Sequence, residues 1–322
     1  MKRLFDRIIK PSTRAFVREA FRTPGYSFFD FLHGYTYARW IYLYIDIATG
    51  QNRFIRLFRT GQTFLRRRLP RLFSREDHRT ARAKLKRALQ KRRAAAGVYH
   101  GKVLPLPLAE ELVRIQKDVR LLDLEKVIPY SKARDIVLKN PDRIAVLECA
   151  CRKAREHPCL PLDVCLVVGE PFASMLVEHH PKRSRWISSG EAVAILQSEH
   201  EKGHVHHAFF KDAMLGRFYA ICNCCACCCG AMQAHRHGIP MLASSGYVAE
   251  ISTSKCTRCL SCQKQCPFSA ITDRDGSIRV NTQKCMGCGI CASACKSKAV
   301  SMMREPAKGV PLSIQDLTGG VV

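Results

Sequence analysis

Residues 256–267 read CTRCLSCQKQCP, and residues 285–296 read CMGCGICASACK. Each stretch spaces four cysteines as C-x2-C-x2-C-x3-C, and Pro267 follows the fourth cysteine of the first stretch. Two-residue spacers let one short loop present three thiolates to one metal centre, so the fourth thiolate has to arrive from elsewhere in the chain. Because the chain contains two complete copies of this motif, the spacing is not a coincidence. They predict that this part of the chain folds around metal.

This is the spacing of bacterial two-cluster ferredoxins, and residues 250–303 resemble that family. The resemblance implies two [4Fe–4S] clusters whose ligands interleave between the motifs. One set is Cys256, Cys259, Cys262 and Cys295, and the other is Cys285, Cys288, Cys291 and Cys266. Lys296 stands where the second motif would carry proline, which leaves the ligands intact. A pair of zinc sites is the alternative, and it is disfavoured because zinc takes four ligands in one closed tetrahedron.

Ten further cysteines lie upstream, in ECACRKAREHPCLPLDVC (148–165) and ICNCCACCCG (221–230). They are Cys149, Cys151, Cys159, Cys165, Cys222, Cys224, Cys225, Cys227, Cys228 and Cys229. Free thiols pack like small apolar groups, and crowding them invites oxidation, so the cysteines are predicted to be metal ligands. They could serve two more cubanes, one cubane with a redox-active thiol set, or a cluster of higher nuclearity. Disulfides or zinc storage are the remaining alternative.

Both upstream segments follow an apolar run, so we expect them at neighbouring strand ends on one edge of a sheet. With these segments ahead of the paired motifs, residues 128–303 resemble a group of cysteine-rich "4Fe–4S dicluster" proteins of anaerobic microbes. The resemblance implies electron transfer in anaerobic metabolism and no defined substrate. The ten upstream cysteines themselves predict at least one iron–sulfur centre beyond the two ferredoxin clusters.

Charge and cysteine divide the chain into regions. Residues 1–100 carry 24 of the 53 basic residues and six of the 27 acidic ones, whereas all 18 cysteines fall between Cys149 and Cys295. We predict an α+β chain with a basic, aromatic-rich helical region over 1–97 and a cysteine-rich α/β domain over 98–249. A ferredoxin domain over 250–304 and a polar tail over 305–322 follow.

The basic region has a helical pattern. Apolar residues recur at helical spacing from Leu4 to Ile9 and from Phe16 to Phe21, and Pro11 suits a first helical turn. Nine aromatic residues lie between Tyr26 and Tyr44, and residues 53–75 and 81–95 combine arginines with helical patterns. These features favour docking to an anionic membrane surface or to a partner subunit. Phosphate binding to nucleic acid is the less favoured alternative.

The middle region alternates helical and strand patterns. AEELVRIQK (109–117) and SKARDIVLK (131–139) predict helices, and RIAVLEC, DVCLVVG and RFYAIC predict strands. Ser188 is predicted to cap a helix that runs to about Lys202 and stops at Gly203. DRDGSIRV (273–280) predicts a hairpin.

Several histidines accompany the cysteines, and GHVHHAFF (203–210) places His204 and His206 on one strand face and His207 on the other. Histidine can ligate cluster iron or relay protons, but surface or hydrogen-bonded histidines are the simpler interpretation. Arg152 could donate to cluster sulfides or be an exposed charge. Nucleotide-binding glycine motifs are absent from the sequence.

The leading hypothesis is an electron carrier that passes single electrons between a low-potential donor and a redox partner protein. The alternatives are a reductase with a catalytic cluster or thiol site upstream, and a nucleic-acid-binding iron–sulfur protein. Whether a substrate is turned over stays open, and a carrier is favoured over an enzyme. The first 22 residues contain no apolar centre of a secretory signal, so we expect a cytoplasmic protein that docks peripherally at the inner face of the membrane.

Overall fold

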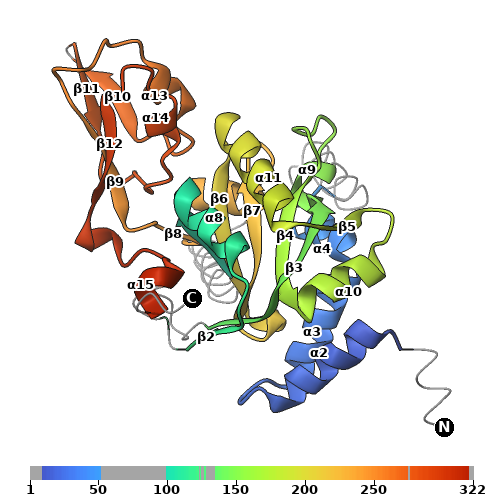
Figure 1. Cartoon of the computed structure of the whole chain (residues 1–322). Helices are drawn as coiled ribbons and strands as arrows, with labels where there is room; N and C mark the ends of the chain where they lie inside the picture. Colours follow the sequence, from blue (N-terminus) through green and yellow to red (C-terminus); the bar gives the residue numbers. More distant parts are fainter. Residues whose placement is uncertain are drawn as a thin grey trace, which may run out of the picture.

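The structure is a computed structural model, which describes residues 9–51, 99–122, 124, 127, 135–274 and 276–318. The pattern from Leu4 to Ile8, the segments 53–75 and 81–95, and the first four residues of SKARDIVLK lie outside the described residues. Within them, the chain is α+β as the sequence predicts, with a mixed sheet, covering helices and a small C-terminal module (Figure 1).

The central sheet holds eight strands, of which seven follow the order β2-β3-β4-β7-β6-β1-β8 while β5 pairs with β3 (Figure 1). They are β1 (Tyr99–Leu104), β2 (Val119–Leu121), β3 (Ile136–Glu148), β4 (Asp163–Glu170), β5 (Ser184–Ile187), β6 (Val205–Lys211), β7 (Arg217–Cys224) and β8 (Leu242–Ala243). The pairs are antiparallel except β1 with β8. All three predicted strands are therefore confirmed, and they lie in β3, β4 and β7.

Alternate residues of the strands face two separate apolar cores. In β6, Val205 and Phe209 belong to one core, and Ala208 and Phe210 to the other. The first face is covered by α2 (Pro11–Arg22), α3 (Phe28–Arg39), α4 (Ile41–Ala48), α9 (Ala150–Lys153), α10 (Phe172–His179) and α12 (Gly230–Arg236). The second is covered by α8 (Leu106–Arg114), α11 (Ser189–Glu201) and α15 (Ile314–Thr318). Because every residue of β6 is buried, this strand lies at the centre of the molecule.

The described part of the basic region consists of three helices packed on the first face. Pro11 begins α2, as predicted, and the fully buried Phe16 packs against Phe172 of α10. The Tyr37 hydroxyl lies 2.9 Å from that of Tyr219 in β7. Phe21, predicted from the same helical stripe, is instead 75% exposed. The helices thus bury one side in the core and leave apolar side chains on the other.

Two local expectations are wrong and one is confirmed. Residues 136–139 of SKARDIVLK belong to β3, where Ile136 and Leu138 are buried in alternation and pair with β2, so tertiary pairing outweighs the helical pattern. The C-terminal segment is not a polar tail, because Leu312 and Ile314 are buried in the second core. The Ser188 side chain caps α11 by accepting from Glu191 N, and Gly203 follows with φ +79°.

The C-terminal module lies at one end of the sheet (Figure 1). It contains β9 (Tyr247–Ile251), α13 (Ser261–Gln265), β10 (Ile271–Arg274), β11 (Ser277–Val280), α14 (Ile290–Ser293) and β12 (Val300–Arg304). The 3-10 turn η2 (Pro306–Lys308) follows β12 and contacts β9, whereas η1 (Asp212–Met214) lies between β6 and β7. Strand β9 pairs with β12, and β10 with β11 forms the predicted hairpin. None of the described helices has the length and apolar character needed to cross a bilayer.

Candidate metal centres

Two cavities in the C-terminal module are lined by interleaved cysteine sets. One is lined by Cys285, Cys288 and Cys291 together with Cys266 of the other motif, and its remaining walls are apolar. The second is lined by Cys256, Cys259, Cys262 and Cys295, and its remaining walls combine apolar residues with polar ones such as Arg258 and Ser261. Each cavity thus has three thiolates from one loop and one from the other, which is the donor set that a [4Fe–4S] cluster takes.

The two sets differ in their exposure to solvent. Three cysteines of the first set are buried and Cys266 is half-buried. In the second set Cys259 is exposed and Cys262 is buried, and the other two are half-buried. Burial raises the pKa of Cys291 to about 12, while hydrogen bonding to Ser261 lowers that of Cys259. We call the two sets the buried ferredoxin set (Cys266, Cys285, Cys288, Cys291) and the exposed ferredoxin set (Cys256, Cys259, Cys262, Cys295). One cluster site therefore faces solvent and the other faces the rest of the protein.

The upstream cysteines converge on one edge of the sheet, as expected, because β3, β4 and β7 are neighbours. Cys165 of β4 pairs directly with Cys222 of β7, and Cys149 follows the end of β3. The sequence could not divide these ten residues, but the structure separates them into a group of six and a group of four.

The six-cysteine group lies on the first face of the sheet, at the N-termini of α9 and α12. Its members are Cys149, Cys151, Cys165, Cys222, Cys224 and Cys229. The Cys224 and Cys229 sulfurs are 3.2 Å apart, and Cys149 interacts with both Cys151 and Cys165. The Cys151 thiol and burial raise the pKa of Cys149 to about 12. Bound metal would offset this effect, because metal ligation requires thiolates.

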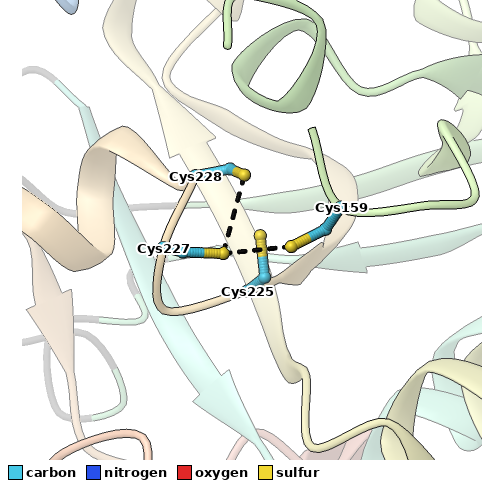
Figure 2. Close-up of side chains that lie close together, drawn as sticks. All are labelled: Cys159, Cys225, Cys227 and Cys228. Atoms are coloured by element: carbon cyan, nitrogen blue, oxygen red, sulfur yellow. Dashed lines mark hydrogen bonds between the residues drawn. The ribbon is translucent and has the colours of Figure 1, made fainter. Parts of the chain in front are cut away.

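The four-cysteine group lies nearer the surface and brings together Cys159, Cys225, Cys227 and Cys228. Figure 2 shows their sulfurs pointing toward one another, with Cys159 on the loop after α9 and the other three on the turn after β7. All four sulfurs lie within 4.8 Å of one another. The Cys159 and Cys227 sulfurs are 3.0 Å apart, and those of Cys227 and Cys228 are 3.6 Å apart.

Arg152 connects the surroundings of both groups and is not an exposed charge. Its guanidinium is buried, forms an ion pair with the buried Glu199, and donates to Pro161 O at 2.5 Å and Asn223 O at 3.0 Å. Burial by itself would raise the pKa of Glu199. Hydrogen bonds from His204 and Arg152 outweigh burial and lower this pKa to about 2. Arg152 thereby holds the Cys159 loop against the end of β7. Its Nη1 and Nη2 atoms hydrogen-bond to protein groups, whereas its buried Nε has no hydrogen-bond partner among the described residues.

The histidines link the C-terminal module to the sheet. His200 Nε2 lies 2.7 Å from Ser293 Oγ of α14, and its Nδ1 lies 3.2 Å from His206 Nε2. His206 Nδ1 in turn lies 2.6 Å from Asn223 Oδ1, between Cys222 and Cys224. The simpler interpretation of hydrogen-bonded histidines fits these residues, although they are buried and not at the surface. The chain of hydrogen bonds fixes the buried ferredoxin set relative to the end of β7.

Tyrosines beside the six-cysteine group were missed by sequence reasoning. The buried Tyr37 and Tyr219, with the half-buried Tyr99, lie near Cys222, and burial raises the pKa of each hydroxyl. Lys211 is buried among tyrosine rings, 4.6 Å from the ring centre of Tyr37 and 5.0 Å from that of Tyr99. Nothing in the sequence marks these residues, because Tyr37 reaches the site only through the packing of α3.

Comparison with known proteins identifies one part of the chain. Residues 249–296 match the family described as the 4Fe-4S dicluster domain. No curated protein and no solved structure matches the chain. The C-terminal module is therefore a 4Fe–4S dicluster domain, and the cysteines gathered upstream of it are consistent with a further iron–sulfur centre.

Proposed function

Because residues 249–296 form a 4Fe–4S dicluster domain, we propose that this protein carries single electrons from a low-potential donor through two clusters to an upstream iron–sulfur centre. That centre is assigned to the six-cysteine group. A redox partner protein takes part at the solvent-facing end. The observation that carries the proposal is the unequal burial of the two ferredoxin sets.

The contacts of the two sets support an order of transfer. Cys288 of the buried ferredoxin set shares one apolar core with Cys224 and Cys229 of the six-cysteine group. Cys259 of the exposed set is open to solvent, where a partner protein can approach. The protein supplies ligation and spacing, while the clusters carry the electrons. The exposed cluster is therefore the point of exchange, and the buried cluster connects it to the upstream centre.

Freeze-quench EPR after mixing with a reduced two-cluster ferredoxin tests this order. In the variant Cys288→Ala/Cys291→Ala, the exposed cluster should still be reduced, while the upstream centre should not. The matched control, Cys259→Ala/Cys262→Ala, removes the exposed cluster and should slow reduction of both remaining centres. Reduction of the upstream centre at the wild-type rate in the first variant would contradict the proposed order.

The docking surface is proposed to be formed by α2, α3 and α4 and to bind an anionic membrane. Of the eleven large apolar side chains exposed among the described residues, six lie on these helices and a seventh, Trp40, lies between α3 and α4. They are Phe21, Phe28, Phe29, Leu32, Trp40, Leu43 and Ile47. Exposed basic residues, among them Arg18 and Arg22, accompany them. Aromatic and basic side chains together bind anionic interfaces.

Flotation of the full chain with anionic liposomes tests the docking surface. Phe28→Ser/Phe29→Ser should weaken flotation, and Leu122→Ser, which also removes an exposed apolar side chain but lies far from these helices in the sequence, should not. Equal flotation of the two variants, or no flotation of the wild type, would refute membrane docking.

The tyrosines favour a second candidate function, which is reduction of a substrate at the six-cysteine group. The Tyr37 and Tyr219 hydroxyls, 2.9 Å apart, stay protonated because burial raises the pKa of both, so they could donate protons to a reduced substrate. This function requires an open coordination position. A substrate-induced change in the EPR signal of the upstream centre would support it, and a signal unchanged by every candidate oxidant would count against it.

A further inference from the structure

We propose that Cys159, Cys225, Cys227 and Cys228 bind one tetrahedrally coordinated divalent ion, zinc or mononuclear iron, and not a four-iron cluster. This inference does not depend on the proposed electron transfer. It separates the four-cysteine group from the six-cysteine group as a metal site of a different kind.

The first argument is the separation of the sulfurs. Tetrahedral thiolate ligands at about 2.3 Å from a single ion lie about 3.8 Å from one another. Two of the sulfur–sulfur distances in the group are 3.0 Å and 3.6 Å, and no two of its sulfurs are more than 4.8 Å apart, so these distances bracket the value for a single ion. In a cubane, each thiolate binds a different corner iron, so the sulfurs stand farther apart than around one ion.

The ferredoxin sets in the same molecule provide an internal comparison. Among the described residues, no ferredoxin set brings three or more ligand atoms within 4.8 Å of one another, as the four-cysteine group does. The sulfurs of the four-cysteine group thus have the spacing of ligands around one ion, and those of the dicluster sites are more widely spaced.

The second argument is how the surrounding backbone holds the ligands. Cys229 N donates to Cys225 O at 3.2 Å, which closes the turn that carries three of the four ligands. Gln233 Nε2 donates to Cys227 O at 2.6 Å, and Arg155 donates to Cys228 O at 3.2 Å. Cys159 arrives from a loop that Arg152 holds through Pro161 O. Four ligands on two short, hydrogen-bonded loops form a closed site, as structural zinc sites do.

The third argument is charge. Four thiols that bind one divalent ion release four protons, and the resulting complex carries a charge of −2. The Arg155 guanidinium, which contacts this turn, offsets part of that charge. A bound ion would join the loop after α9, which carries Cys159, to the turn after β7, which carries the other three ligands.

Metal and sulfide counts on the full-length, anaerobically purified protein test the site. Cys159→Ala/Cys227→Ala should lose one metal ion per chain and no acid-labile sulfide, with the EPR signals of the ferredoxin clusters unchanged. Cys259→Ala/Cys262→Ala is the matched control and should lose about four irons and four sulfides. Two ligands are removed at each site so that a three-iron remnant is not mistaken for loss of one ion.

Loss of irons with equal sulfide from Cys159→Ala/Cys227→Ala would overturn the proposal in favour of a cluster. No loss of metal would overturn it in favour of free or disulfide-bonded thiols. If that variant does not fold, anaerobic native mass spectrometry of the wild type decides the matter. One metal ion without a matching sulfide is expected, and complete matching of metal to sulfide would contradict the inference.

Discussion

Substitution of Gly287 tests how the dicluster domain is attached to the sheet. Gly287 lies between Met286 and Cys288 and has a φ of +67°. A Cβ atom there would lie 2.2 Å from Ser245 Oγ and 2.3 Å from Tyr247 O. Ser245 Oγ also donates to Gly287 O at 2.7 Å, and Ser245 N donates to Met286 O at 3.1 Å. The change Gly287→Ala should therefore disrupt the packing between Gly287 and residues 245–247, which positions the buried ferredoxin set.

The expected loss has two parts. A left-handed backbone costs a residue with Cβ about 1–2 kcal/mol. Overpacking against a backbone oxygen that cannot move away costs about 1–3 kcal/mol more. Gly276 is the matched control, because its φ is +76° but the nearest atom to an added Cβ is the flexible end of Arg258 at 3.4 Å. Gly276→Ala should therefore cost only the first part.

Anaerobic guanidinium denaturation, followed by the visible absorbance of the clusters, measures both variants. Gly287→Ala should have the lower unfolding free energy by about 1–3 kcal/mol, and its buried cluster should be lost first in EPR. Equal losses in the two variants would refute the close contact between Gly287 and residues 245–247, and with it the argument that this contact fixes the buried cluster.

Three further predictions concern the sheet and its surroundings. Glu199→Gln leaves the buried Arg152 without its counter-ion and should lower the unfolding free energy in urea by about 3–5 kcal/mol, and a loss under about 1 kcal/mol would contradict a desolvated pair. Burial lowers the pKa of Lys211 to about 8 in the folded protein, whereas the ordinary value of 10.5 applies to the unfolded chain. Between these pH values the unfolded chain binds more protons than the folded one, so the unfolding free energy should rise with pH by about 3 kcal/mol at most. Lys211→Met should lack that rise in parallel denaturation curves. Ser188→Ala should cost about 1 kcal/mol of unfolding free energy and Ser188→Asp should restore it, whereas equal stability of all three proteins would exclude a cap at α11.

Several local features could be predicted because neighbouring residues determine them. Pro11 at the start of α2, the cap at Ser188 and the hairpin of β10 and β11 follow from short-range backbone preferences. The helix predicted over residues 136–139 was wrong because these residues pair with β2, which comes earlier in the chain, and this pairing outweighs their helical pattern. The prediction of a polar tail was wrong for the same kind of reason, because Leu312 is buried only through its contacts with the second core.

The same distinction between local and long-range determinants applies to the metal sites. The sequence alone determined that the C-terminal module is a 4Fe–4S dicluster domain, because spacer lengths within short loops decide which thiolates can face one cluster. Only the tertiary structure decided that the ten upstream cysteines form a group of six and a group of four. That division depends on β4 lying beside β7 and on where the loop of Cys159 meets the turn of Cys225, and such long-range pairing is not encoded in the spacing of either segment.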